Sequence, residues 1–266
     1  MAVAQVQIPV SSQPASDFRL TGPMVQGGVL LGFAPTGTVA LRLGDQQVPV
    51  DADGRFLIAF DRDAGPSAHL TARLPDGHMV ERTLIVAPRY WRIERIDAPM
   101  RPTRSTEAFL ALRKPELAAI AAARAMHTDA QGWRQRFIWP RTGRLSGLFG
   151  SQRVYQGQPG AYHGGVDVAG ATGEPVVAPA AGVVILAADK PFSLEGNLLM
   201  IDHGHGLNSA FLHLSRIDVK PGQVVAQGQR IGAVGATGRA TGPHLHWGMM
   251  WDGARIDPLL LAGPMP

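Results

Sequence analysis

Short apolar runs separated by turn residues recur over residues 19–100. They include 29–33 (VLLGF), 39–43 (VALRL) and 56–60 (FLIAF), and Gly, Pro or Asp stands between successive runs. Runs of this length, bounded by turn formers, are typical of β-strands rather than of helices. We therefore expect residues 19–100 to form a small β-sandwich domain. The polar, Ser- and Pro-containing residues 1–18 before it are expected to form a flexible arm.

The pattern changes over residues 101–138, where helix formers replace the strand-like runs. Ala118–Met126 is rich in alanine, which has the highest helix propensity. Ser105-Thr106-Glu107 can begin a helix, and Pro115-Glu116 can begin another, because proline is tolerated in the first helical turn. The sequence therefore predicts a short helical connector. This connector could consist of two short helices with a break before Pro115.

A second β-rich region follows over residues 139–266. Its apolar runs, such as 182–186, 197–202 and 209–214, are again interrupted by glycines and prolines. Six of the nine histidines lie in this region. Candidate chemistry is therefore concentrated in the C-terminal half of a mainly β protein.

Two of these histidines are spaced for a metal or acid–base site. His244 and His246 are two residues apart, so on a strand both side chains project from one face. Leu245 and Trp247 would then point to the opposite face, into a core. On a helix the two histidines would diverge, and helical zinc pairs use the i, i+4 spacing instead.

A second segment supplies an imidazole and a carboxylate. His163 and Asp167 flank a Gly-Gly pair, which argues against a helix because each glycine destabilises a helix by about 1 kcal/mol. In an extended segment the two side chains lie on one side, while Val166 and Val168 face the core. Imidazole and carboxylate groups suit zinc, and a tetrahedral shell needs at least one ligand more.

Either His244 or His246 can be the third ligand. The fourth position then stays open for the water that a hydrolytic zinc activates. His213 lies on another expected strand, with Leu212 and Leu214 alternating to the opposite face. Together with the histidine that the metal does not use, His213 is free for proton transfer or for stabilising an oxyanion.

These segments resemble the lysostaphin-type (LytM-like) zinc metalloendopeptidases, which cut the peptide cross-links of peptidoglycan. The resemblance covers about residues 140–260, and its motifs are specific and occur in the family's order. It rests on Phe149-Gly150 followed by Arg153, His163-Gly164-Gly165-Val166-Asp167-Val168, Pro175-Val176-Val177-Ala178, Asp202-His203-Gly204, His213-Leu214-Ser215 and the run from Gly235 to His246.

The resemblance implies a role for each site residue. His163, Asp167 and His246 correspond to the ligands of one zinc ion per chain. His213 and His244 correspond to the catalytic histidines beside the metal-bound water. The implied fold is a mostly antiparallel β domain over residues 139–266, with the metal on the floor of an open groove.

Several further residues stay outside this set. The segment Asp202-His203-Gly204-His205-Gly206 is expected to form a turn in which both histidines are structural. Phe211 stands where many members of the family carry tyrosine, so any contribution of that hydroxyl is missing here. Residues that can reach the groove without belonging to the catalytic set are Tyr155, Tyr162, Asn197 and Arg239.

The function implied is hydrolysis of peptidoglycan cross-links by a zinc-dependent endopeptidase. His213 or His244 would accept the proton of the water, and the sequence leaves open which of them is the base. One alternative is a non-catalytic LytM-like module that binds peptidoglycan or activates an amidase, although such modules have lost ligands and all five positions are intact here. Another is a β-sandwich adhesion or envelope-binding protein with incidental histidines.

The composition argues against several classes of protein. The net charge is only +4, and no dense block of Lys and Arg with interleaved aromatic residues is present, so nucleic acid is not an expected partner. No run of 18 or more apolar residues occurs, so we expect no integral membrane segment. Cysteine is absent, which excludes disulfides, Cys-zinc sites and thiol nucleophiles.

The expected location follows from the N-terminus and the resemblance together. The first residues lack the basic and apolar regions of a signal peptide, which fits either a cytoplasmic protein or an exported one whose signal has been removed. With the resemblance, we expect a periplasmic or extracellular protein that acts on peptidoglycan cross-link peptides. The N-terminal domain could bind an envelope protein, and a connector folded over the groove would block it.

Overall fold

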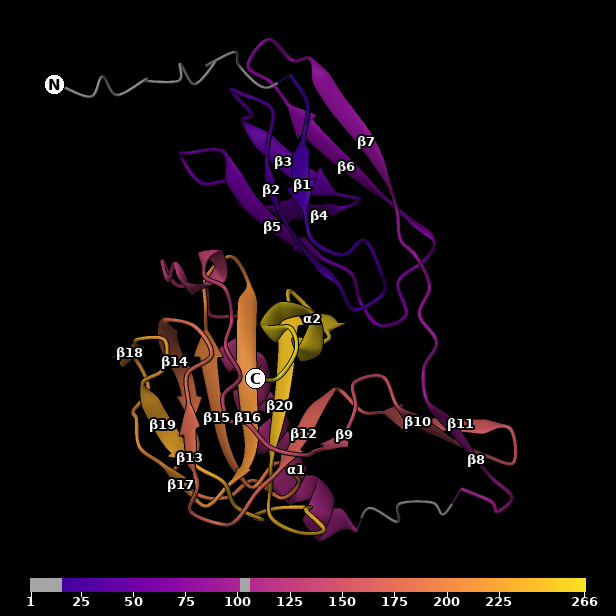
Figure 1. Cartoon of the computed structure of the whole chain (residues 1–266), viewed down its shortest axis with the longest axis vertical. Helices are drawn as coiled ribbons and strands as arrows, with labels where there is room; N and C mark the ends of the chain where they lie inside the picture. The colour runs from indigo at the N-terminus through magenta and orange to yellow at the C-terminus, as the bar shows by residue number, and fades with distance from the viewer. Residues whose placement is uncertain (1–15, 101–105) are drawn as a thin grey trace, which may run out of the picture.

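Two antiparallel sheets form the N-terminal part of the chain. The computed structural model describes residues 16–100 and 106–266, so most of the arm predicted at 1–18 and the helix start at Ser105 lie outside it. Figure 1 shows the two sheets side by side. One consists of β1 (Arg19–Thr21), β2 (Val29–Phe33) and β5 (Arg55–Ala59), and the other of β3 (Ala40–Leu43), β4 (Gln46–Val48), β6 (Ser67–Arg73) and β7 (Met79–Ile85).

Buried apolar side chains explain why these strands form. Leu30 and Ile58 are fully buried in the first sheet, and Leu41 and Leu70 are fully buried or nearly so in the second. All four belong to the same hydrophobic cluster. Their burial supplies the main stabilisation that short strands require.

One strand connects this part with the second half of the chain. β8 (Ile93–Ile96) pairs in parallel with β10 (Gln152–Tyr155), which also forms a hairpin with β11 (Gln158–Tyr162). Figure 1 shows these three strands beside the main C-terminal sheet. The first hundred residues therefore contribute β8 to a three-stranded sheet whose other strands, β10 and β11, lie just before His163 in the sequence.

The connector contains one continuous helix rather than two. α1 runs from Glu107 to Arg124 with Pro115 inside it, and the side chain of Thr106 caps its first turn by accepting a hydrogen bond from the Phe109 amide. The predicted break before Pro115 is wrong. Tertiary contacts on both sides of the proline account for this, because Arg113 and Glu116 each bind the loop that contains Ser193 and Glu195.

The main C-terminal sheet is antiparallel, as expected. Its strands follow the order β18-β14-β15-β16-β20-β12-β9, and β21 pairs with β20. They are β9 (Leu145–Gly147), β12 (Gly165–Ala169), β14 (Gly182–Ala187), β15 (Asn197–Asp202), β16 (Leu207–Leu214), β18 (Val224–Val225), β20 (His244–Trp251) and β21 (Ala254–Ile256). A smaller sheet comprises β13 (Pro175–Val177), β17 (Arg216–Ile217) and β19 (Arg230–Ala233), and the short elements are η1 (Gly132–Arg134) and α2 (Pro258–Ala262).

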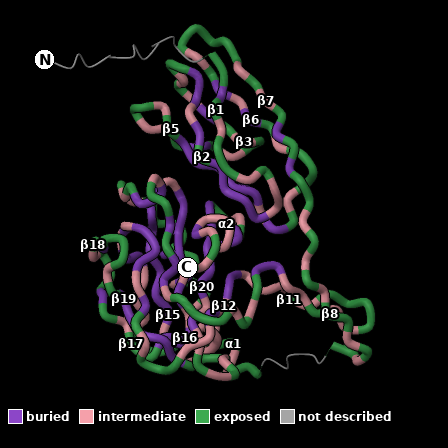
Figure 2. The backbone as a smooth tube through the Cα atoms, in the orientation of Figure 1, coloured by how far each residue is buried: buried purple, intermediate pink, exposed green. Residues whose placement is uncertain are grey.

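The two faces of the main sheet differ in what covers them. One face is buried in the large core through side chains such as Val166, Phe211 and Trp247, and Figure 2 shows buried positions concentrated in these strands. On the other face α1 packs Ile120 and Ala123 into a smaller apolar cluster with residues of β14 and β15. No helix in the described part of the chain is long and apolar enough to cross a membrane.

Ion pairs join the N-terminal sheets to the C-terminal half. Asp51 bonds His205 Nε2 at 2.7 Å and also pairs with Arg134. Arg89 pairs with the buried Asp257 at 2.8 Å. These contacts hold the two parts against each other at the edge of the C-terminal core.

Replacing Phe211 with alanine is expected to lower the free energy of unfolding by about 3–5 kcal/mol, because the ring is fully buried opposite Trp247 and its removal leaves a cavity. Chemical denaturation followed by circular dichroism measures this change. The control is Tyr90→Ala, since the Tyr90 side chain is fully exposed and its loss should change stability by no more than about 0.5 kcal/mol. Equal effects of the two substitutions would contradict the prediction.

Candidate metal centre

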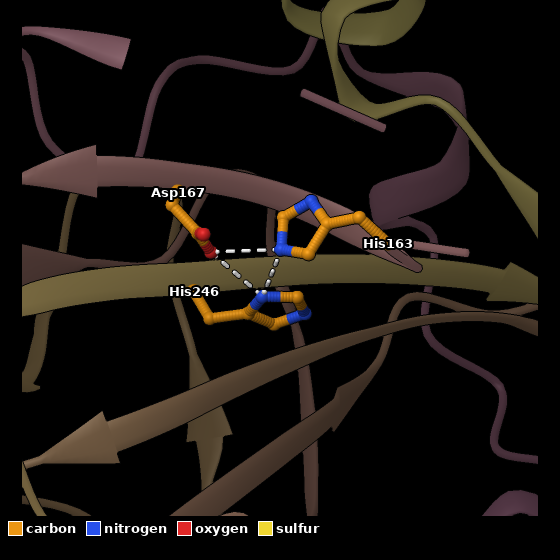
Figure 3. A group of neighbouring side chains, drawn as sticks. All are labelled: His163, Asp167 and His246. Carbon is orange, nitrogen blue, oxygen red and sulfur yellow. Dashed lines mark hydrogen bonds and ion pairs between the residues drawn. The ribbon is translucent and has the colours of Figure 1, made fainter. Parts of the chain in front are cut away.

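Three side chains from separate parts of the sequence meet above the main sheet. Asp167 Oδ1 lies 3.1 Å from His163 Nε2 and 2.8 Å from His246 Nδ1, and the two nitrogens are 3.1 Å apart. Figure 3 shows the three groups converging on one point. Two ligand atoms of one zinc ion lie no more than about 4 Å apart, because each is about 2.0–2.2 Å from the metal. The cluster therefore fits a single zinc ion.

The sheet register brings these residues together. β12 and β20 are antiparallel neighbours, and Asp167 stands directly opposite His246. Leu245 and Trp247 are fully buried on the other face, so the alternation expected for this strand is confirmed. Gly147, on the adjacent β9, leaves room for the carboxylate, because a Cβ at this position would collide with Asp167 Oδ2.

Hydrogen bonds and charges prepare the cluster for a cation. The His163 Nδ1 hydrogen is directed at the Leu148 carbonyl, 3.2 Å away, so Nε2 of the neutral ring is unprotonated and faces the site. Burial alone would raise the pKa of Asp167, but hydrogen bonds and charge from His163 and His246 lower that pKa well below its usual range. Burial lowers the pKa of His246 and so favours the neutral imidazole that binds metals.

Two further imidazoles lie beside the cluster. The rings of His213 and His244 are 4.9 Å apart, and His244 Nε2 is 3.8 Å from Asp167 Oδ1. Their Nδ1 atoms lie 2.8 Å from the carbonyls of Thr237 and Gly242 respectively. Since a carbonyl only accepts, each Nδ1 carries a proton, and in the neutral ring Nε2 has the free lone pair.

A β-bulge directs His213 toward the site. Leu212 and His213 together oppose the single residue Leu198 on β15, and His213 has a φ of 64°. Leu212 pairs with His246 and faces the same side of the sheet, so the expected alternation of Leu212 to the opposite face is wrong. β-Bulges often reorient side chains beside active sites. Because Leu212 faces the same side of the sheet as His246, regular strand alternation would point His213 to the opposite side. The bulge instead directs the His213 imidazole toward the metal cluster.

The other residues named from the sequence lie in three different places. His203, His205 and Asn197 make structural hydrogen bonds, to Ser209, Asp51 and the Leu214 carbonyl respectively. Phe211 lies in the core, on the face away from the cluster. An open groove of about 1130 Å³ leads away from the metal cluster, and it is lined by residues that include Tyr155, Tyr162, His163, Asp167 and Arg239.

The sequence did not identify the backbone carbonyls that orient the histidines. The carbonyls of Leu148, Thr237 and Gly242 fix which ring nitrogen of His163, His213 and His244 carries the proton. A carbonyl is common to every residue type, so no pattern of side chains marks it. Only the folded backbone shows which ones lie within hydrogen-bond distance.

The comparisons with known proteins agree with this arrangement. Residues 161–258 match the sequence model described as peptidase family M23. The chain contains an M23 peptidase domain. This span includes the three residues of the metal cluster and the two histidines beside it, His213 and His244.

Relatives and a solved structure extend the similarity of the M23 domain. The chain is 39% identical over 132 residues to the peptidoglycan DD-endopeptidase ShyA of Vibrio cholerae, covering 49% of this chain and 30% of ShyA. It is 40% identical over 104 residues to the DD-carboxypeptidase/endopeptidase Mpg of Neisseria meningitidis, covering 39% of this chain and 24% of Mpg. This chain therefore spans less than a third of the length of these relatives.

A crystal structure described as an M23 peptidase from Pseudomonas aeruginosa resembles nearly the whole chain. The TM-score is 0.69 at 29% identity, and the match covers 90% of this chain and 95% of that one. This coverage extends beyond residues 161–258, so the structural similarity is not confined to the M23 domain.

Stability is expected to fall as the pH drops from about 6.5 to 4, because burial lowers the pKa of His203 to about 4. In this window the unfolded chain binds a proton that the folded chain does not, so His203 contributes a slope of up to roughly 1.4 kcal/mol per pH unit. Unfolding free energies of the wild type and His203→Gln, measured at several pH values, test this. Parallel pH profiles for the two proteins would contradict it.

Proposed function

We propose that the M23 domain hydrolyses the peptide cross-links of bacterial peptidoglycan. The observation that carries the proposal is the convergence of His163, Asp167 and His246 beside two histidines whose Nδ1 atoms donate to backbone carbonyls, so that Nε2 of each neutral ring can accept a proton. The relatives' names, which describe peptidoglycan endopeptidases, support the substrate class. We assign His163, Asp167 and His246 as zinc ligands, and His213 and His244 as catalytic residues.

The proposed mechanism divides the work between the metal and the histidines. Zinc, when bound, supplies Lewis-acid chemistry by lowering the pKa of water and polarising the scissile carbonyl. One of His213 and His244 accepts the proton of the attacking water at Nε2 and later delivers it to the departing amine. The other, when it carries a second proton on Nε2, donates a hydrogen bond to the developing negative charge, and the hydrogen bond at Nδ1 keeps each ring in place.

The groove gives the substrate access to this centre. Its walls include Arg92 just before β8, Glu94 of β8, Tyr155 of β10 and Arg239 of the loop before β20. Because α1 does not line this groove, the expectation of a blocked site finds no support on this side of the cluster. A peptide lying in the groove would pass directly over His163 and Asp167.

We place the catalytic unit at residues 139–266, with 101–138 as the connector and 19–100 as a separate N-terminal domain. The five proposed site residues all lie in the catalytic unit, so no specific observation favours the non-catalytic alternative. Since peptidoglycan lies outside the cytoplasm, we propose a periplasmic or extracellular site of action. Binding of an envelope protein by the N-terminal domain remains a prediction.

Digestion of purified peptidoglycan tests the proposal. The zinc-loaded chain is expected to release cross-link fragments, and mass spectrometry of these products identifies the bond that is cut. The same protein stripped of metal by a chelator serves as the control, and activity should return when zinc is added. Binding to peptidoglycan without any new chain termini in the presence of zinc would overturn the assignment as an endopeptidase.

A further inference from the structure

A second cavity lies on the other side of His246 from the metal cluster. It has a volume of about 200 Å³ and separates α1 from strands β15, β16 and β20. Such a volume accommodates several water molecules or a small group of a ligand. The polar side chains around it are Arg124 of α1, Glu195, Asn208, His246 and Arg255 of β21.

His246 presents a hydrogen-bond donor to this cavity. With Nδ1 directed at the metal cluster, the proton of a neutral ring is on Nε2, and Figure 3 shows this nitrogen pointing away from Asp167 and His163. A Cβ on Gly248, which lines the cavity, would lie 3.5 Å from Nε2. Metal-binding histidines almost always donate their second N–H to an acceptor, yet Nε2 bonds no described residue.

Two guanidinium groups add positive charge at the same place. Arg124 and Arg255 form no ion pair with any residue in the described ranges, although Arg255 lies over the ring of Tyr162. Desolvation and the charge of Arg255 lower the pKa of Arg124, and the charge of Glu195 only partly opposes them. The carboxylate of Glu195 is already engaged, because Arg113 holds both its oxygens at 2.6 and 2.7 Å.

We propose that this cavity binds a carboxylate group of the peptide substrate, with Arg124 and Arg255 as its main partners and His246 Nε2 as a further donor. The inference rests on the proposed peptidase function and specifies its substrate: a peptide with a free carboxylate close to the bond that is cut. Guanidinium groups suit this role because they bind carboxylates through paired hydrogen bonds.

The proposal assigns a function to the connector helix. Arg124 is the last residue of α1, and the Arg113–Glu195 ion pair fastens the same helix to the loop before β15. The helix therefore completes a binding site beside the metal rather than covering the open groove. Arg124 and Arg255 are specificity residues in this view, since neither belongs to the metal cluster.

Equilibrium binding tests the proposal without requiring cleavage. N-acetyl-D-alanine and its uncharged amide are titrated against the zinc-loaded full-length chain and followed by NMR. The wild type should bind the acid at least about tenfold more tightly than the amide, because only the acid forms charge-assisted hydrogen bonds with the guanidinium groups. Arg124→Gln and Arg255→Gln should each bring the ratio close to one, whereas Arg124→Lys should restore part of it.

Control variants distinguish a carboxylate bound in the cavity from one bound at the metal. Arg73→Gln removes an exposed arginine from β6 and should leave the ratio unchanged. Zinc content and melting temperature of each variant show that the metal site and the fold remain. If the acid is still preferred in both Gln variants, the carboxylate binds the metal instead and the proposal is wrong. Equal binding of acid and amide by the wild type would also overturn it.

Cleavage of matched acid and amide peptides provides the second readout. The wild type should show a higher kcat/KM for the peptide acid, and the two Gln variants should lose that preference while still cleaving the amide. If the wild type cleaves neither peptide nor peptidoglycan, the proposed peptidase function fails. A carboxylate preference in the binding experiment would in that case survive as a property of the cavity.

Discussion

Replacing Asp167 with asparagine is expected to abolish zinc binding and to reduce peptidoglycan cleavage by about 10³-fold or more. The substitution keeps the shape of the side chain but removes the negative charge at the point where His163 and His246 converge. Lewis-acid activation is worth several kcal/mol of transition-state stabilisation, and each 1.4 kcal/mol corresponds to a factor of ten in rate. Zinc content per chain and the rate of fragment release measure the two effects.

A matched variant and a stability measurement make this prediction specific. Asp189→Asn changes an exposed carboxylate in the loop after β14 and should retain both zinc and activity. Zinc should raise the melting temperature of the wild type, because a ligand that binds only the folded state stabilises it, and this increase should disappear in Asp167→Asn. A variant that retains one zinc per chain and normal activity would remove Asp167 from the ligand set.

The second large effect is expected at His213. His213→Asn should retain zinc while cleavage falls by roughly 10²–10⁴-fold, the range typical of a lost general acid or base. Asparagine is the appropriate replacement because His213 has a φ of 64°, and asparagine tolerates this backbone conformation better than alanine does. Zinc content, circular dichroism and cleavage rate together distinguish loss of chemistry from loss of fold.

The pH profile identifies the role of His213. Burial lowers the pKa of this side chain, so it is neutral near pH 7 and can accept a proton. If His213 is the base, activity should rise with pH through that lowered pKa, and this acidic limb should change in His213→Asn. If His244 is the base instead, the limb should persist in His213→Asn and change in His244→Ala.

The exposed His69 of the N-terminal sheet provides a control for both variants. His69→Ala removes an imidazole far from the cluster in sequence and should leave zinc content, cleavage and pH profile unchanged. Full activity in both His213→Asn and His244→Ala would contradict the proposed division of proton transfer between them.

The sequence determined the fold class and the candidate site to a large extent. His244 and His246 are two residues apart between apolar neighbours, and this local spacing places both on one face of a strand wherever the strand packs. The Gly-Gly pair between His163 and Asp167 similarly excludes a helix by its own conformational preference. Short runs bounded by turn formers indicated a mainly β protein because strand length and turn chemistry are local properties.

Only the tertiary structure decided how these pieces fit together. The register that sets Asp167 opposite His246, the bulge that re-aims His213 and the parallel pairing of β8 with β10 each depend on a partner strand distant in the sequence. The continuity of α1 through Pro115 depends on contacts with Ser193 and Glu195, which outweigh the local preference for a break. Propensity acts within a few residues, whereas these features arise from packing and hydrogen bonds between segments that meet only in the folded chain.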